Sequence, residues 1–211
     1  MYLIFLGAPG AGKGTQAKAL CQDLGVPHIS TGDMLRAAQA NGSKLGREIN
    51  EIMKSGSLVS DTIVLDLIKE RLKGNDAANG AIFDGFPRTL AQAEGLSHFP
   101  NLSLSHVISL DVQEDRSVKR LTGRRTCKGC GAMFHVEFRP SVTDGICDAC
   151  GSELYQREDD NDSSIRNRLA VYHNNTAPLI CYYSEKGLLR EVCASGTPAE
   201  VTVRIKTVLG V

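Results

Sequence analysis

The segment from Gly7 to Thr15, GAPGAGKGT, has the composition and spacing of a loop that binds phosphate. It follows the apolar run Tyr2–Leu6 and leads into a helix-period pattern, which is the strand–loop–helix setting that such a loop needs. Its glycines let backbone N–H groups surround phosphate oxygens at the positive end of a helix, and Lys13 adds a mobile cation. Gly14 stands where the general pattern has serine or threonine. We therefore predict a phosphate site, with this departure as a clue to the kind of enzyme.

A second group of reactive side chains, Asp84–Thr89 (DGFPRT), follows the strand candidate Ala81–Asp84. Open α/β sheets bind ligands at the carboxyl ends of their strands, so we expect Asp84 and Arg88 to lie beside the phosphate loop. An ordinary turn would explain Gly85–Pro87. It would not explain an acid at the strand end and an arginine four residues later, so this segment favours a binding site.

Arginines concentrate on both sides of a segment that is rich in cysteine and glycine. They are Arg120, Arg124 and Arg125 before it, and Arg157, Arg166 and Arg168 after it. Surface arginines usually form a solvated face or weak ion pairs. Phosphoryl transfer, however, uses multidentate cations on oxygens that carry charge in the transition state, worth on the order of 10³-fold or more in rate. The arrangement is typical of cations that close on a phosphorylated substrate.

Four of the seven cysteines form two short pairs with the spacing of a metal site. Cys127 and Cys130 are followed, after sixteen intervening residues, by Cys147 and Cys150. This spacing lies in the range of a tetrahedral four-thiolate zinc site with no open position for catalysis. Zinc is the prediction, and iron remains open at such a site. For the remaining cysteines we expect packing roles without disulfides, because the cytosol is reducing. These are Cys21, Cys181 and Cys193.

The composition describes an ordinary soluble protein of 211 residues, with 42% apolar and 23% charged residues. Lys+Arg and Asp+Glu both number 24, which argues against bulk nucleic acid or an anionic membrane as the main partner. No apolar run approaches the length of a membrane span, and the N-terminus lacks the basic start and cleavage site of a leader. We therefore expect a cytoplasmic protein.

Apolar, β-branched runs alternate with helix-period stretches along the chain. Strands are expected near 2–6, 28–29, 81–84, 106–110 and 188–193. Helices are expected over 13–24, 31–41, 44–55, 61–73 and 89–96. Another helix is expected after the strand at 106–110 and up to about 121, and three more over 163–174, 177–186 and 198–209. This alternation predicts the α/β class, with a doubly wound parallel sheet covered by helices on both faces. The core comprises 1–29, 60–121 and 161–211, with a small helical insert at 30–59 and a second insert at 122–160.

Taken together, the segments GAPGAGKGT, TGDMLR, DGFPRT, LTGRR and RNRLAVYHNNTAPLICYY resemble the adenylate kinase family in order and spacing. TGDMLR is weak alone, since Thr31 as a helix N-cap and Arg36 as a solvated charge would account for it. The resemblance covers essentially the whole chain, and the family also carries glycine after the loop lysine. It implies reversible phosphoryl transfer, Mg·ATP + AMP giving two ADP. The insert at 30–59 would bind AMP, and that at 122–160 would be a lid.

The resemblance also implies roles for individual residues. It places on ATP the residues Gly10, Ala11, Gly12, Lys13, Gly14, Thr15, Arg120, Arg124, Met133 and Phe134. It places on AMP the residues Thr31, Arg36, Ser57, Leu58, Val59, Gly85, Phe86, Pro87, Arg88, Gln92, Arg157 and Arg168. Catalysis would fall to Lys13, Arg88, Arg124, Arg157 and Arg168. Gln92 would read the adenine edge, and Asp159 would stabilise the closed lid.

Two metal ions follow from these assignments. Because no serine or threonine follows Lys13, Mg²⁺ is expected to be held by phosphates and waters, with Asp84 ordering the waters. Long-form bacterial adenylate kinases resemble this chain in carrying a metal-bearing lid that takes no part in chemistry. A structural zinc ion at the four cysteines would make the lid a rigid moving body. The implied partners are ATP, AMP and ADP, and the implied state is a monomer.

Two alternatives remain open at this point. The first is another nucleoside monophosphate kinase, of the UMP/CMP type. Thr31, Gln92 and the metal-bearing lid favour adenine nucleotides over this alternative. The second is a zinc-ribbon module that binds nucleic acid and is attached to a nucleotide switch. Balanced charge, 5% aromatic residues and the lack of tryptophan give it little stacking surface or basic footprint.

Overall fold

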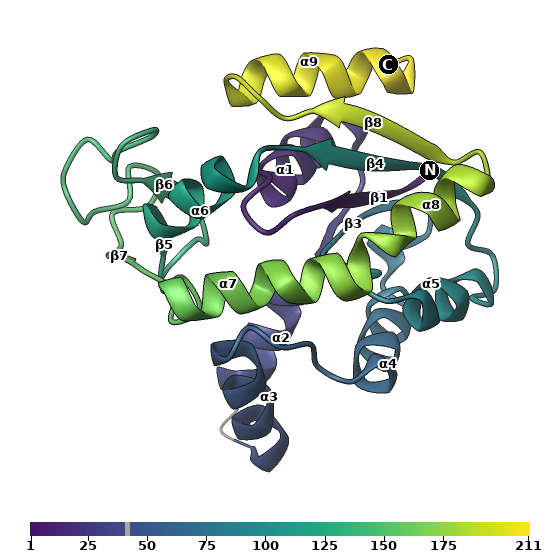
Figure 1. Cartoon of the computed structure of the whole chain (residues 1–211), viewed down its shortest axis with the longest axis horizontal. Coiled ribbons are helices and arrows are strands. Elements are labelled where there is room, and N and C mark those ends of the chain that lie inside the picture. Colours follow the sequence, from purple (N-terminus) through teal and green to yellow (C-terminus); the bar gives the residue numbers. More distant parts are fainter. Residues whose placement is uncertain (41–42) are drawn as a thin grey trace.

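The computed structural model describes residues 1–40 and 43–211. Within these ranges five strands form a parallel sheet in the order β2-β3-β1-β4-β8, shown in Figure 1. The strands are β1 (Tyr2–Gly7), β2 (His28–Ser30), β3 (Ala81–Asp84), β4 (Leu104–Asp111) and β8 (Leu189–Cys193). The expected α/β class with a doubly wound parallel sheet is confirmed.

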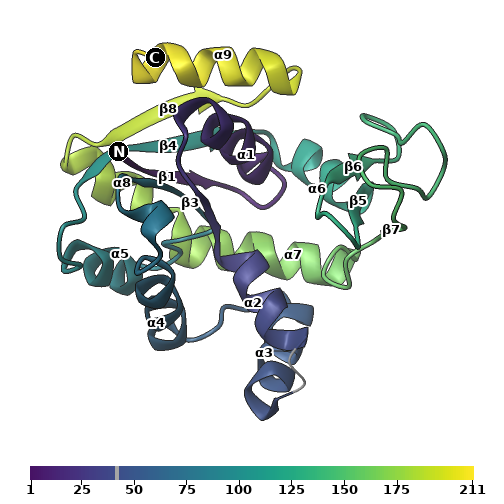
Figure 2. The same ribbon diagram turned by 180° about the vertical axis from the view of Figure 1, so that it is seen from behind.

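Strand β1 divides the hydrophobic core between the two faces of the sheet. Its successive side chains point to opposite sides, so Leu3 and Phe5 join one cluster of buried residues whereas Ile4 and Leu6 join another. The first cluster includes buried residues of α1 (Lys13–Leu24) and α9 (Pro198–Leu209). The second includes residues of α4 (Asp61–Arg71), α5 (Leu90–Ser97) and α8 (Pro178–Glu185). Figure 2, seen from behind, shows α1 in front of the sheet and α8 beyond it.

Capping residues explain where two of the predicted helices begin or end. Helix α1 begins at Lys13, and its C-cap Gly25 has φ 64°, a left-handed conformation that glycine adopts without steric cost. Helix α9 begins with Pro198, and the Thr197 and Glu200 side chains each accept from the other's backbone N–H in a capping box. Both helices have the predicted bounds.

Two regions lie outside the central sheet. Helices α2 (Thr31–Ala40) and α3 (Lys44–Lys54) project below it in Figure 1; the expected end of the first helix, at residue 41, lies outside the described residues. Between α6 (Glu114–Thr122) and α7 (Asp162–Val171), three short antiparallel strands form a second sheet in the order β6-β5-β7. These strands are β5 (Arg124–Cys127), β6 (Met133–His135) and β7 (Leu154–Tyr155).

Helix α7 contacts the end of α3 through direct hydrogen bonds. The Ser164 hydroxyl donates to the Lys54 carbonyl at 2.5 Å, and the Asn167 amide donates to the Ser55 carbonyl at 2.7 Å. The backbone approaches so closely that a Cβ on Gly56 would lie 2.7 Å from the Ser164 carbonyl oxygen. The N-terminal end of α7 also follows directly on the second sheet, so this helix adjoins both projecting regions.

The structure differs from expectation in three places. The helices expected at 163–174 and 177–186 are joined by a wider π-helical turn, Tyr172–Thr176, just before Pro178, which has no N–H to continue the α-helical ladder. A 3₁₀ turn at Asn75–Ala77 was not expected. Cys181 and Cys193 are exposed, so the core role expected for them is wrong. No helix within the described ranges is long and apolar enough to cross a membrane.

Candidate functional site

The loop after β1 is held in shape by a close approach to α6. Gly10 has φ +85°, and a Cβ there would lie 2.6 Å from the Ser117 carbonyl oxygen, so only glycine fits. The Lys13 ammonium reaches back into the loop and donates to the carbonyls of Gly7 at 2.7 Å and Ala8 at 2.9 Å. Burial, partly opposed by Asp84, lowers the pKa of Lys13 to about 8. The loop thus holds a cation that nearby phosphates would keep charged.

The glycine after Lys13 has a steric reason. A Cβ on Gly14 would lie 2.9 Å from Oδ2 of Asp84, so the carboxylate occupies the space that a serine or threonine would need. His28 contacts the same oxygen through Nε2 at 3.3 Å. Burial alone would raise the pKa of Asp84, but the His28 contact and the Lys13 charge outweigh it and lower the pKa. An ionised carboxylate therefore lies directly beside the phosphate loop.

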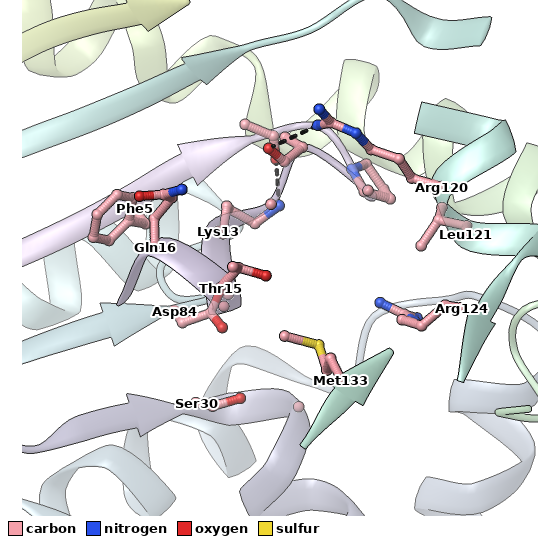
Figure 3. A pocket seen from close by; sticks show the side chains of 18 of the residues that line it. Phe5, Lys13, Thr15, Gln16, Ser30, Asp84, Arg120, Leu121, Arg124 and Met133 are labelled. Carbon is pink, nitrogen blue, oxygen red and sulfur yellow. Dashed lines mark hydrogen bonds between the residues drawn. The ribbon is translucent and has the colours of Figure 1, made fainter. Parts of the chain in front are cut away.

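A large cavity opens from this loop toward the second sheet on one side and α2 on the other (Figure 3). Among the described residues that line it are ten lysine and arginine side chains but only four carboxylates. The cations are Lys13, Lys18, Arg36, Arg88, Arg116, Arg120, Arg124, Arg139, Arg157 and Arg168, and the acids are Asp33, Asp84, Asp159 and Glu200. Such an excess of cations suits polyanionic ligands.

Two arginines of this cavity are fixed by an acid that the sequence did not single out, Asp160. Its carboxylate is fully buried and accepts from Arg124 Nε at 2.8 Å and Nη2 at 2.5 Å. It also pairs with Arg168 Nη1 at 3.2 Å. Asp159, the acid that was predicted, contacts Arg168 Nη1 at 2.9 Å. The adjacent acids thus hold both guanidinium groups at one end of the cavity.

Three further arginines of the cavity contact neutral or acidic groups. Arg157 donates from Nε to the Thr126 hydroxyl at 3.1 Å, and burial with the charge of Arg124 lowers the pKa of Arg157 to about 10. Arg88 donates from Nε to the Gly85 carbonyl at 2.8 Å, and Arg36 contacts Asp33 at 2.6 Å. Each of these guanidinium groups keeps further N–H donors for a ligand.

A small pocket lies beside the large cavity. It is lined by Thr31, Ser57, Leu58, Val59, Val64, Gly85, Arg88 and Gln92. Thr31 donates to the Gly85 carbonyl at 2.7 Å, and Gln92, which is 1% exposed, accepts from the Arg88 backbone N–H at 2.8 Å. Because Ser57, Leu58, Gly85 and Arg88 line both hollows, the two form one continuous site.

Most of the predicted site residues lie together in this site. Those assigned to ATP all line the large cavity: Gly10, Ala11, Gly12, Lys13, Gly14, Thr15, Arg120, Arg124, Met133 and Phe134. Those assigned to AMP line one or both hollows except Phe86, which is fully buried and packs on Phe83. Of the six arginines flanking the second sheet, Arg125 and Arg166 do not line the cavity.

The four paired cysteines converge on a single point. Their sulfur atoms all lie within 4.8 Å of one another, with Cys127 and Cys150 at 3.4 Å and Cys130 and Cys147 at 3.6 Å. Thiolates around a tetrahedral ion with metal–sulfur bonds of about 2.3 Å would be about 3.8 Å apart. The backbone N–H groups of Gly129 and Cys130 point at the Cys127 sulfur, as expected for a thiolate ligand. The cluster therefore fits a bound metal ion.

Sequence reasoning missed several residues that line the site or support it, among them Asp160, His28 and Asp61. Asp160 adjoins Asp159 between two arginines, a signal that could have been noticed. His28 belongs to the short strand predicted at 28–29, and nothing in its spacing pointed to Asp84. Asp61 accepts from Gln92 Nε2 at 2.8 Å, a contact between residues 31 positions apart that only the fold reveals.

Comparison with known proteins agrees with this geometry. A family model described as Adenylate kinase matches residues 5–188 of the chain. A protein named adenylate kinase from Thermodesulfovibrio yellowstonii is 53% identical over 212 residues, covering 99% of each chain. One from Caldicellulosiruptor saccharolyticus is 48% identical over the full length of both. Another, from Archaeoglobus fulgidus, is 52% identical over 91% of this chain and 90% of its own.

Substitution of Asp160 by asparagine should destabilise the protein, because it removes the fully buried carboxylate that the partly buried Arg124 and Arg168 share. Breaking a buried ion pair costs about 3–5 kcal/mol, which predicts a fall in melting temperature of roughly 6–20 °C for a chain of this size. The exposed Asp144→Asn is the matched control and should melt within about 1 °C of the unmodified protein. Equal melting of both variants would contradict the role given to Asp160.

The affinity of the site for ATP should fall as pH rises through about 8. The ammonium form of Lys13 would attract phosphate, and because burial lowers its pKa to about 8 in the free protein, alkaline solution removes that charge before binding. Calorimetric titration between pH 7 and 9.5 should show a decline that Lys13→Met, which binds more weakly throughout, lacks. A flat profile for the unmodified protein would rule out this assignment.

Proposed function

This chain belongs to the adenylate kinase family and transfers a phosphoryl group between ATP and AMP, and we propose how the residues of its continuous site divide that work. One observation carries the division: the phosphate loop lines a cation-rich cavity, and the small pocket shares Ser57, Leu58, Gly85 and Arg88 with that cavity. A donor nucleotide on the loop and an acceptor nucleotide at the pocket would bring their phosphates together among the arginines.

On the donor side, the ATP phosphates lie along Gly10–Thr15, with Lys13 on the terminal phosphates. The steric fit of the loop against α6 and the buried ammonium of Lys13 support this. Arg120 donates to the carbonyls of Ala11 and Ala194, which positions its guanidinium at the mouth of the cavity, where we assign it to the adenine ring. Met133 and Phe134 line the same region from β6 and complete the adenine contact.

On the acceptor side, AMP places its base against the residues that line the small pocket, which must widen to admit the base, and its phosphate between Arg36 and Arg88. Thr31, Gly85 and the run Ser57–Val59 line the base, and Gln92 meets its edge. The free N–H donors of Arg36 and Arg88 support the phosphate position, since planar guanidinium groups match phosphate oxygens in pairs.

The transfer itself needs little proton chemistry, because the attacking oxygen of AMP is already ionised. Lys13, Arg88, Arg124, Arg157 and Arg168 surround the transferring group and stabilise the charge on its equatorial oxygens. Adenylate kinases use Mg²⁺ with ATP, and the ion would neutralise phosphate charge, with the ionised Asp84 ordering its waters. Catalysis then rests on orientation and on charges fixed before the reaction.

We propose a division into three parts: a core of 1–29, 60–121 and 161–211, an AMP-binding insert at 30–59 and a lid at 122–160. Direct contacts with neighbouring parts support mobile inserts that rest on the core. Lys18 of α1 donates to the Gly131 carbonyl of the lid at 3.1 Å, and Lys54 of the insert pairs with Glu158 of the lid at 3.1 Å. Both contacts of the lid are polar, and the Lys54–Glu158 pair is exposed, so both can be exchanged for water when the lid opens for each turnover.

Zinc is our proposal for the ion at Cys127, Cys130, Cys147 and Cys150. Four thiolates with no vacant position suit structural zinc, and the cluster stabilises a lid with a core of few apolar residues. The cluster has no part in the reaction. We further propose a cytoplasmic monomer without nucleic-acid or membrane partners, supported by the zero net charge; sedimentation at 22.7 kDa would test the monomer.

A coupled assay with Mg·ATP and AMP, UMP, CMP or GMP tests the acceptor assignment, and AMP should be preferred. Arg88→Ala should then lower kcat with AMP on the order of 10²–10³-fold, because a cation is lost from both the acceptor phosphate and the transition state. The exposed Arg166→Ala serves as the matched control and should remain near normal. Turnover of Arg88→Ala within about threefold of the control would remove Arg88 from the site.

Replacement of Cys147 and Cys150 by serine should release the bound metal and lower the melting temperature, because two of the four thiolate ligands are lost. Metal content by mass spectrometry and thermal melting provide the measurements. The exposed pair Cys181→Ser and Cys193→Ser, outside the cluster, should keep one metal per chain. Unchanged metal content in the first variant would refute the site, and bound iron in the unmodified protein would replace zinc as the ion.

A further inference from the structure

The side-chain amide of Gln92 is held by two partners whose roles are unambiguous. Its Oε1 accepts from the backbone N–H of Arg88 at 2.8 Å, and its Nε2 donates to Oδ1 of Asp61 at 2.8 Å. A backbone N–H can only donate and a carboxylate can only accept. The oxygen and nitrogen of this amide are therefore assigned by chemistry, although such atoms are usually hard to distinguish.

Asp61 is itself fixed in place. It is the first residue of α4, and its Oδ1 also accepts from the Thr89 hydroxyl at 3.0 Å. The same hydroxyl accepts from the Gln92 backbone N–H at 3.1 Å, so its own hydrogen is directed at Asp61. Asp61 lines neither hollow of the site, whereas Gln92 lines the small pocket. The carboxylate therefore acts on a ligand only through the glutamine.

We propose that Asp61 is a positioning residue that sets the base specificity of the acceptor site by preventing the Gln92 amide from turning over. This inference rests on the proposed function, which puts the acceptor base in the small pocket. The hydrogen bonds to Arg88 and Asp61 use one lone pair of Oε1 and one N–H of Nε2. The amide keeps one N–H donor and one oxygen lone pair for a ligand, and it cannot exchange the places of the two.

This fixed order distinguishes two purines of nearly identical shape. On its Watson–Crick edge adenine presents an amino donor at position 6 and an acceptor at N1, which pair with the Gln92 oxygen and nitrogen respectively. Hypoxanthine presents an acceptor at position 6 and a donor at N1, the reverse pattern. To bind it equally well the amide would have to turn over, which would bring Oε1 against the Asp61 carboxylate. Asp61 thereby selects the 6-amino purine.

Asp61→Asn tests this, because an asparagine at that position either donates or accepts and so removes the charge-based restraint while keeping the shape. The acceptor activities with AMP and with inosine 5′-monophosphate are measured side by side. We expect the ratio of their kcat/KM values to fall about tenfold, through the KM of the acceptor, with the KM of ATP unchanged. Asp66→Asn, an exposed acid on the same helix, is the matched control and should keep the ratio.

A merely structural role for Asp61 predicts a different result, in which activity with AMP and with inosine 5′-monophosphate falls by the same factor. That outcome, or an unchanged ratio, overturns the inference. If the asparagine variant does not fold, Asp61→Ala carries the same comparison, since it also frees the amide nitrogen.

A third variant separates this inference from the function on which it rests. Gln92→Leu keeps much of the side-chain volume but removes the amide, and it should raise the KM of AMP at least about tenfold. If Gln92→Leu leaves that KM unchanged, the acceptor assignment of the pocket fails. If Gln92→Leu behaves as expected but Asp61→Asn keeps its preference for AMP, only the role of Asp61 fails.

Discussion

The site depends on one constraint, which is the burial of many cations that also repel one another in a single cavity. Burial lowers the pKa of Lys13 to about 8 and, with the charge of Arg124, that of Arg157 to about 10. The free protein tolerates this charge by placing carboxylates between the cations, among them the fully buried Asp160. The carboxylates do not balance the cations, and nucleotide phosphates would supply the missing negative charge. The site is therefore stabilised by its own substrates, and the electrostatic stabilisation used in the reaction is assembled before it begins.

Much of the fold could be predicted because its signals are local. A buried strand, a glycine-rich loop and an amphipathic helix each leave a pattern within a dozen residues, so β1, α1 and α9 were predicted almost to the residue. The same holds for the phosphate loop and the paired cysteines, whose spacing alone brings the ligands together. The π-helical turn between α7 and α8 was missed, because a single proline in a helical pattern does not reveal how the preceding turn adapts.

The parts of the site that escaped prediction depend on contacts between distant residues. The reason for Gly14 emerges only when Asp84, seventy positions later, is seen to fill the space beside it. Arg124 and Asp160 are 36 residues apart. Net charge gave no sign of this cavity, since equal totals of acids and bases conceal a site where cations clearly outnumber acids. Composition describes the whole chain, whereas ligand binding depends on which charged side chains lie together in one cavity.

Helix α7 links the acids that hold the cavity arginines to the end of α3. Asp159 and Asp160, just before its first turn, hold Arg124 and Arg168 at one end of the cavity, and Ser164 and Asn167 on its next turns contact the end of α3. Helix α7 is thus a common support for the two projecting regions (Figure 1). A displacement of α7 would change its contacts with the end of α3 and with the arginines held by Asp159 and Asp160 together, so the positions of the two regions would be coupled.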